Sequence, residues 1–136
     1  MPHTKFPVEV LTPEGEVFND EVEQISTRTA VGSIGVLAHH QPILAMLDPT
    51  ELRLYRTESE VVRFAQAEGY MQMAGNHALI LVEEAHPPGD LDAASLRERL
   101  QQAERELESA GDDTEKRRVA ERDKNRLEAF LSIAEA

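Results

Sequence analysis

Apolar and polar residues alternate in short runs over roughly the first eighty positions, a pattern typical of strands with one covered face. Phe6, Val8 and Val10 alternate with Pro7 and Glu9, and later runs are rich in valine, isoleucine and threonine. Between the runs lie segments with the proline, glycine and asparagine of tight turns, among them residues 12–15 and 74–77. Short strands separated by turns every ~8–12 residues predict an antiparallel β-sandwich or barrel.

Residues 43–47 break this alternation, because all five of them are apolar. A short apolar run without polar alternation is typical of a strand that is covered on both faces. We therefore expect residues 43–47 to form a buried strand.

The pattern changes across residues 83–92, where Pro87, Pro88 and Gly89 interrupt any regular element. Beyond Leu91 the apolar residues recur at helical spacing. Asp90 or Asp92 is expected to cap a first helix. Gly111 is expected to end it, and Asp112 with Glu115 is expected to cap a second. The apolar stripes are Leu96, Leu100, Ala103 and Leu107 in the first helix, and Ala120, Leu127, Phe130, Leu131 and Ala134 in the second.

These patterns divide the chain into three parts. A β-sandwich of about ten short strands occupies residues 1–86, a joint occupies 87–90, and an antiparallel two-helix hairpin occupies 91–136. The second helix carries few large apolar groups, so we expect it to dock weakly, with other positions within a few kcal/mol. The alternative is a hairpin fixed on the sandwich, since static packing is the usual purpose of such stripes.

Composition narrows the possible functions. The net charge of −12 argues against binding to nucleic acid, whose phosphates require a basic surface. The chain has no cysteine, so disulfides, thiolate metal sites and cysteine nucleophiles are excluded. The first residues carry no recognisable targeting signal, and the longest apolar run, residues 78–82, is far too short to cross a bilayer. Any association with a membrane is therefore expected to occur through a partner.

Candidate catalytic and metal-binding residues are few. Glu83 and Glu84 are adjacent, and neighbours in a strand point to opposite sides, which argues against an acid–base pair. The same argument, applied to His39 and His40 in an extended loop, disfavours a shared metal. We expect no metal and no catalytic residue.

Four segments in register resemble one known family. Residues 32–44 contain a glycine-rich strand followed by His40-Gln41-Pro42-Ile43-Leu44, and residues 68–73 begin with Glu-Gly-Tyr. Residues 78–85 read Ala-Leu-Ile-Leu-Val-Glu-Glu-Ala, and residues 10–18 form an opening hairpin around Pro-Glu-Gly. Together with the change to helices near residue 90, these segments are similar to the epsilon subunits of F-type ATP synthases of bacteria.

The resemblance implies a non-catalytic subunit of the central stalk that contacts the gamma subunit and the ring of c subunits. It would help to couple rotation to catalysis in the alpha and beta subunits, and its helices would extend to restrain ATP hydrolysis. The subunit would be peripheral, on the cytoplasmic face of the bacterial cell membrane. Two alternatives remain: a static assembly adaptor with an inert tail, and an ATP-sensing module.

The resemblance also implies roles for individual residues. Ser33 and the loop residues His39, His40 and Gln41 would contact the c-ring or gamma. Arg118, Arg122 and Arg126, which are spaced four apart and share a helix face, would contact a beta subunit when the tail extends. The simpler interpretation of these arginines is pairing with acidic residues of their own helix.

Three departures from the family pattern affect these expectations. Ala38-His39 stands where the family has Pro-Gly, and Ser33 stands where an acidic residue is common. Relatives that bind ATP carry (Ile/Leu)-Asp-x-x-Arg-Ala at the start of the first helix. Here Leu91 and Asp92 match that motif, but its arginine is absent. We therefore expect no cofactor, and weak ATP binding or none.

Overall fold

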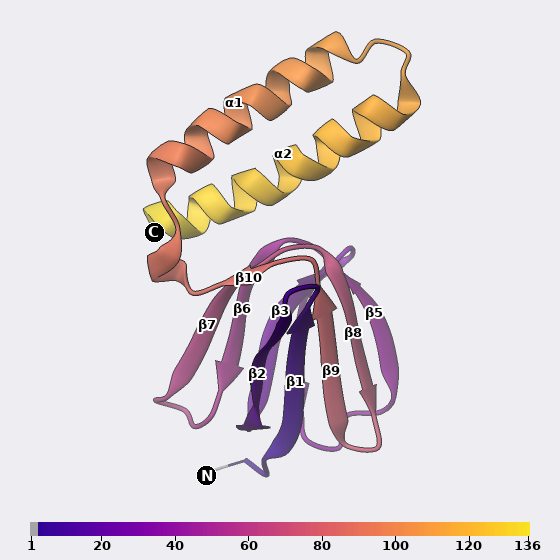
Figure 1. Cartoon of the computed structure of the whole chain (residues 1–136). Coiled ribbons are helices and arrows are strands. Elements are labelled where there is room, and N and C mark those ends of the chain that lie inside the picture. The colour runs from indigo at the N-terminus through magenta and orange to yellow at the C-terminus, as the bar shows by residue number, and fades with distance from the viewer. Residues whose placement is uncertain (1–2) are drawn as a thin grey trace.

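The computed structural model describes residues 3–136 as a curled β-sheet followed by two antiparallel helices (Figure 1). In order, the elements are β1 (Phe6–Thr12), β2 (Gly15–Val22), β3 (Gln24–Thr29), β4 (Gly32–Leu37), β5 (Ile43–Leu47), β6 (Thr50–Tyr55), β7 (Val61–Gln66), β8 (Gly69–Ala74), β9 (His77–Val82), β10 (Ala85–His86), a 3₁₀ turn η1 (Pro88–Asp90), α1 (Ala93–Ser109) and α2 (Thr114–Glu135). The predicted fold class, a β-sandwich of about ten strands followed by a helical hairpin, is confirmed.

The strands form one sheet in the order β10-β7-β6-β3-β5-β8-β9-β1-β2, with β4 paired to β3. The pairing is antiparallel except between β1 and β9, which run parallel. The sheet curls until its two ends approach. There the rings of Phe18 on β2 and Phe64 on β7 meet edge to face at 6.5 Å, and Arg56 forms a 3.0 Å ion pair with Asp20. These contacts close the sandwich where backbone pairing stops.

Alternation along the strands places one apolar set inside this curl. Phe6, Val8 and Val10 of β1 are fully buried, as predicted from their spacing. One polar side chain, Gln66, is fully buried with them. Its amide oxygen accepts a hydrogen bond from the Thr27 hydroxyl (2.6 Å), and its amide nitrogen donates to the carbonyls of Asp48 and Ala67. Each polar atom is thereby satisfied, as a buried amide requires.

The turn between β8 and β9 forms at the glycine and asparagine that predicted it. Gly75 and Asn76 both have positive φ angles, +57° and +61°, as a two-residue hairpin turn requires. Gly111 likewise ends α1 in the left-handed conformation, with φ +56°.

Helix caps follow the predictions in one case and differ in the other. Asp92 caps α1, and its side chain accepts hydrogen bonds from the backbone N–H groups of Ala94 and Ser95. The cap of α2 is Asp113, which accepts from the N–H of Lys116, so the prediction that Asp112 would cap this helix is wrong. After the left-handed turn at Gly111, α2 therefore begins one residue later than the sequence pattern predicts.

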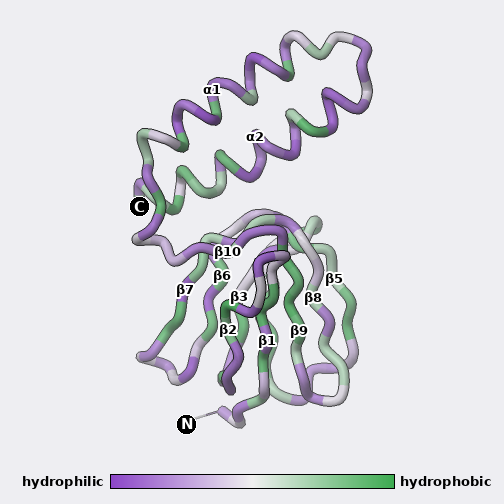
Figure 2. The backbone as a smooth tube through the Cα atoms, in the orientation of Figure 1, coloured by the Kyte–Doolittle hydropathy of each residue, from purple (hydrophilic) through white to green (hydrophobic). Residues whose placement is uncertain are grey.

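The hairpin rests on the sandwich mainly through α2, whose C-terminal half lies near β6 and β7 (Figure 1). Leu127 and Phe130 of α2 are buried in a second apolar cluster with Ala65 and Ala67 of the sandwich and Leu96 of α1. The remainder of the hairpin extends beyond the sheet and is largely hydrophilic (Figure 2). The apolar contact between the two parts is therefore confined to the end of the hairpin near the joint.

Gly69 is a site where the fold admits no side chain. A Cβ at this position would lie 2.0 Å from the backbone carbonyl oxygen of Leu81, which β-sheet pairing holds in place. We predict that Gly69→Ala lowers the free energy of unfolding by about 1–3 kcal/mol, because the strands must separate locally. Urea denaturation followed by circular dichroism measures this loss.

The matched control is Gly89→Ala, because nothing lies within 4 Å of a Cβ there. Equal stability of the two variants would contradict the steric argument.

Candidate functional site

A row of large apolar side chains crosses the outer surface of four neighbouring strands. Met46 of β5 pairs with Tyr70 of β8, Tyr70 pairs with Leu81 of β9, and Leu81 pairs with Leu11 of β1. Leu44 lies two residues along β5 from Met46, on the same face. The exposed fractions are 72% for Leu44, 63% for Met46, 51% for Tyr70 and 44% for Leu81. We refer to Leu11, Leu44, Met46, Tyr70 and Leu81 as the apolar face.

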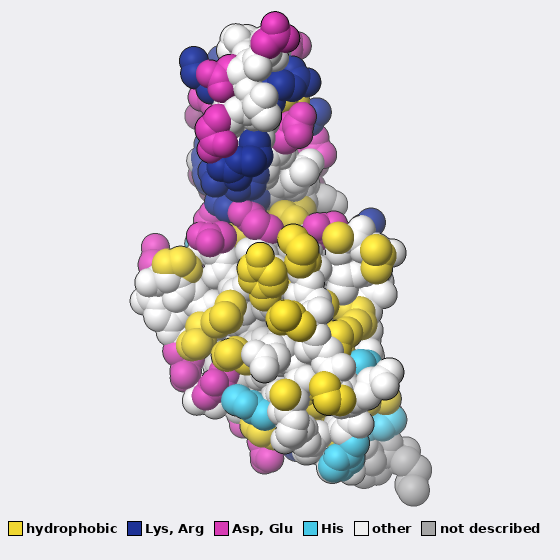
Figure 3. Space-filling model, turned by 90° about the vertical axis from the view of Figure 1, so that its right-hand side faces the viewer, with side chains coloured by type: hydrophobic (Ala, Val, Ile, Leu, Met, Phe, Trp, Pro, Cys, Tyr) yellow, Lys and Arg dark blue, Asp and Glu magenta, His cyan; other side chains and the backbone are white. Residues whose placement is uncertain are grey.

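Hydrophobic side chains cover much of this side of the sandwich (Figure 3). The prediction that residues 43–47 form a fully buried strand is therefore only half right. They form β5, but Leu44 and Met46 point outward while Leu47 is buried. A contiguous exposed apolar surface on a soluble domain usually marks a contact with another protein. An uninterrupted apolar strand within an otherwise alternating sheet was the signal for this surface in the sequence.

The second feature is an ionic cluster between α2 and the sandwich. The guanidinium of Arg126 donates two hydrogen bonds to the carboxylate of Glu68, one of them at 3.0 Å, and one to Glu84 at 2.6 Å. The other oxygen of Glu84 lies 2.9 Å from Nε2 of His86, whose ring meets Phe130 of α2 edge to face. We call Glu68, Glu84 and Arg126 the latch.

The backbone positions the two carboxylates of the latch. Glu68 lies in the turn before β8 and Glu84 in the turn after β9, and these turns are paired. The N–H of Glu83 donates to the carbonyl of Glu68 (3.1 Å), and the N–H of Ala67 donates to the carbonyl of Glu84 (2.9 Å). A planar guanidinium with several donors matches two carboxylates held in this way.

The latch shifts the ionisation of its members. Burial disfavours the charged form of Glu68, but hydrogen bonds and charge from Arg126 outweigh this, so the pKa of Glu68 lies below its usual 4.5. Burial also lowers the pKa of Arg126, but the interactions with Glu68 and then Glu84 outweigh it, and the net change raises the pKa. The ionised pair is therefore the stable form.

The c-ring or gamma residues implied by the resemblance occupy two places. Ser33 lies near the start of β4, opposite Arg28 in β3, whereas His39, His40 and Gln41 follow the end of β4. The strand runs for four residue steps from Ser33 to Leu37, roughly 13 Å at ~3.3 Å per residue, before the turn that carries His39. The structure therefore does not bring these residues together.

The histidine loop is shaped by a contact with the β8–β9 turn. His39 has a φ of +61°, so the loop is not extended as assumed, and its N–H donates to the side chain of Asn76 at 2.7 Å. Nδ1 of His40 lies 2.7 Å from the carbonyl oxygen of Gln41. Within residues 3–136, no group of three or more histidine, aspartate or glutamate residues is arranged to hold a metal ion.

The three arginines that share a face of α2 have different surroundings. Arg118 pairs with Glu115 (2.6 Å) and Arg122 with Asp123 (3.0 Å), both on the exposed surface of the helix. Arg126 instead belongs to the latch. Its sequence spacing gave no sign of this, because its partners lie 58 and 42 positions away.

At the start of the hairpin, Asp92 is the α1 cap and Leu91 packs at the edge of the apolar cluster with Leu127 and Phe130. Arg97, the nearest arginine to the incomplete ATP motif, pairs with Glu135 at the end of α2 (3.2 Å). These residues therefore hold the two ends of the hairpin together.

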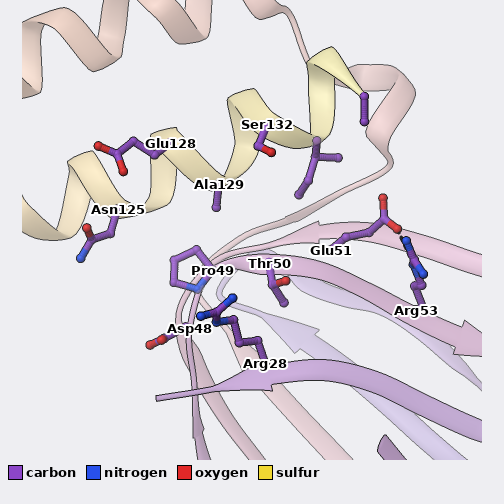
Figure 4. A pocket seen from close by; sticks show the side chains of 12 residues that line it. Arg28, Asp48, Pro49, Thr50, Glu51, Arg53, Asn125, Glu128, Ala129 and Ser132 are labelled. Atoms are coloured by element: carbon purple, nitrogen blue, oxygen red, sulfur yellow. Dashed lines mark hydrogen bonds and ion pairs between the residues drawn. The ribbon is translucent and has the colours of Figure 1, made fainter. Parts of the chain in front are cut away.

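An open groove of about 720 Å³ lies beneath α2 on the side of β3 and β6 (Figure 4). Asn125, Ala129 and Ser132 lie along the helix above Pro49 and Thr50 (Figure 4). Its charged residues are of both signs: Arg28 and Arg53, with Asp48, Glu51 and Glu128. The Arg53–Glu51 ion pair (2.6 Å) already satisfies part of this charge.

The lowered pKa of Glu68 gives a pH prediction. A carboxyl group whose pKa falls on folding stabilises the folded state above its unfolded value, here about 4.5, and this contribution is lost as the pH falls through the folded value. We predict that the wild-type chain loses more stability between pH 5 and pH 3 than Glu68→Gln does. Urea denaturation at the two pH values measures the difference.

Glu58→Gln, at an exposed position in the turn between β6 and β7, is the control and should lose stability like the wild type. If all three chains lose stability equally, the latch makes no contribution to acid sensitivity.

Comparisons with known proteins agree with this architecture. Residues 5–88 match the family model described as the ATP synthase delta/epsilon chain, beta-sandwich domain. An ATP synthase epsilon chain of Persephonella marina is 36% identical over 130 residues, covering 95% of this chain and 96% of the relative. One from a Sulfurihydrogenibium species is 30% identical, with 95% and 96% covered.

Two solved structures share the fold at lower identity. A chain in the mitochondrial ATP synthase of Euglena gracilis, a complex of OSCP, F1 and c-ring, has a TM-score of 0.78 and 23% identity, covering 97% of this chain and 82% of that one. A chain in the central stalk and c-ring of the Tetrahymena thermophila mitochondrial ATP synthase has a TM-score of 0.65 and 20% identity, covering 98% and 99%. The family model spans the sandwich and the bacterial relatives span both parts of the molecule, and so this chain belongs to the family of ATP synthase epsilon chains.

Proposed function

We propose that this chain is a non-catalytic subunit of the central stalk of a bacterial F-type ATP synthase, docked on the gamma subunit through its apolar face. The exposed row of Leu44, Met46, Tyr70 and Leu81 carries this proposal, because a chain acting alone gains nothing from leaving these side chains in water. Burying each of them in an interface contributes up to ~1.5–3 kcal/mol before the cost of association.

The end of the sandwich away from the helices is the proposed contact with the c-ring. It carries His39, His40 and Gln41, in a loop whose shape is set by the hydrogen bond to Asn76. Ser33, at the other end of β4, is then a contact with a different partner or with another part of gamma. In this proposed arrangement the subunit lies on the cytoplasmic face of the membrane and reaches the membrane only through its partners. None of the described helices is long and apolar enough to span a bilayer.

The helical hairpin is the proposed regulatory element. Its docking depends on one end of α2, where Leu127 and Phe130 are buried and the latch is only partly shielded from solvent. Part of the apolar cluster also involves Leu96 and Ala103 of α1, so it survives when the hairpin leaves the sandwich as a unit. The net cost of release is therefore on the order of a few kcal/mol. Release would present Arg118, Arg122 and Arg126 to a beta subunit and thereby restrain hydrolysis.

ATP is not expected to control this movement. The motif at Leu91 and Asp92 lacks its arginine, and Arg97 is engaged by Glu135. We infer weak ATP binding or none, and calorimetric detection of millimolar or tighter binding would contradict this. A static adaptor is the second candidate, favoured by the latch itself, because three hydrogen bonds from Arg126 hold the docked position.

The docking proposal is tested at Met46. We predict that Met46→Glu weakens binding of the gamma subunit at least about tenfold, because a carboxylate must then be buried against an apolar surface. Surface plasmon resonance with immobilised gamma measures the change. Glu58→Gln lies outside the apolar face and should bind like the wild type, and unchanged binding by Met46→Glu would exclude this face.

The regulatory proposal is tested by ending the chain after Asp90. We predict that the assembled motor then hydrolyses ATP several-fold faster, because no helices remain to enter the catalytic head. ATPase assays on membranes, normalised to the amount of assembled complex, measure the rate. Unchanged hydrolysis in a correctly assembled complex would favour the static adaptor.

A further inference from the structure

The latch lies on the border of the apolar face. Glu68 is separated from Tyr70 only by Gly69, and Glu84 lies in the turn after β9, three residues beyond Leu81. Acidic side chains form a row along the upper border of the hydrophobic surface, directly below basic side chains of the helices (Figure 3). A protein that covers the apolar face therefore reaches the carboxylates of the latch as well.

The two carboxylates are partly accessible to solvent. The side chains of Glu68 and Glu84 keep 29% and 30% of their surface exposed, whereas Arg126, which bridges them, keeps 14%. An approaching cation can thus contact either carboxylate before Arg126 leaves.

The charge balance at this border favours such a cation. Arg126 supplies one positive charge to two carboxylates. The other basic groups nearby are His86, 2.9 Å from Glu84, and Arg122, whose charge acts on Glu68 more weakly than that of Arg126. The latch therefore retains excess negative charge, and a basic side chain placed there gains favourable interactions with it.

We propose that the surface of gamma that covers the apolar face carries a lysine or arginine beside its apolar contact residues, and that this cation competes with Arg126 for Glu68 and Glu84. Docking on gamma then weakens the binding of the hairpin to the sandwich. Conversely, a docked hairpin weakens the binding of the sandwich to gamma. This mutual opposition follows from linkage, since both events use the same carboxylates. The inference rests on the proposed docking on gamma and adds its regulation.

Two variants distinguish this competition from a steric mechanism, in which the docked hairpin simply blocks the approach of gamma. We call the steric mechanism steric release. Arg126→Gln frees both carboxylates for gamma, so we expect gamma to bind about fivefold tighter or more, the lower end of typical coupling between sites. The double variant Glu68→Gln with Glu84→Gln also frees the hairpin but removes the groups that gamma would use, so its binding should not tighten. Steric release predicts tighter binding in both cases.

Binding is measured with the purified gamma subunit of the same enzyme and the full-length chain. Arg105→Gln is the matched control, because Arg105 lies on the exposed surface of α1, outside the latch and the apolar face, and its loss should leave binding unchanged. Circular dichroism confirms folding of each variant. Arg126→Lys, which keeps the charge but not the forked geometry, provides a milder change and should tighten binding by a smaller factor.

Hairpin movement is measured separately by fluorescence energy transfer. The chain has no cysteine, so Glu58→Cys and Gln101→Cys introduce two unique labelling sites, one on the sandwich and one on α1. Gamma should change the transfer efficiency of the wild-type background. It should cause a much smaller change with Arg126→Gln, in which the hairpin is already released.

Equal affinity of the wild type and Arg126→Gln would overturn the competition, and so would tighter binding by the glutamine double variant. In either case the proposed function stands as long as Met46→Glu weakens binding. Failure of the wild-type chain to bind gamma at all would instead overturn the proposed function.

Discussion

The guanidinium of Arg126 lies between the carboxylates of Glu68 and Glu84, and this contact fixes where the helical hairpin sits on the sandwich. The contact depends on backbone pairing, because the turns before β8 and after β9 are joined by hydrogen bonds that hold both carboxylates in place. An ionic contact of this kind is directional but only partly shielded from water. It selects one docked position without making that position permanent, since the apolar cluster behind it is small.

The same strands carry the apolar face on their outer surface. β8 and β9 bury Met71 and Ile80 inside the sandwich while they present Tyr70 and Leu81 outside. A large exposed apolar surface of this kind usually marks a contact with another protein. The turns at the ends of these strands also carry the latch. The proposed docking of a partner and the docking of the hairpin therefore both involve β8 and β9. This proximity is the physical reason for treating the two events as coupled.

The comparisons have different weight for the fold and for the site. Bacterial epsilon chains at 30–36% identity cover nearly all of this chain, and mitochondrial chains at 20–23% identity retain its fold. A fold at such low identity says little about individual side chains, because core packing tolerates substitution that sites do not. The roles of the latch and the apolar face therefore depend on their own geometry.

The sequence by itself determined the local structure. Alternation gave the strands, Gly75 and Asn76 gave a turn with positive φ, and Asp92 and Gly111 marked the ends of the first helix. Each of these features depends on residues within a few positions of one another, so a local pattern is sufficient to find it.

Only the tertiary structure decided which neighbours each face of a strand or helix contacts. Alternation separates the two sides of a strand but cannot say which apolar side remains uncovered, and so Leu44 and Met46 were expected inside and lie outside. Arg126 was grouped with Arg118 and Arg122 by spacing along the helix, yet its partners come from turns 42 and 58 residues away. Contacts over such separations are set by sheet register and by the curl of the whole sandwich, which no short stretch of sequence encodes.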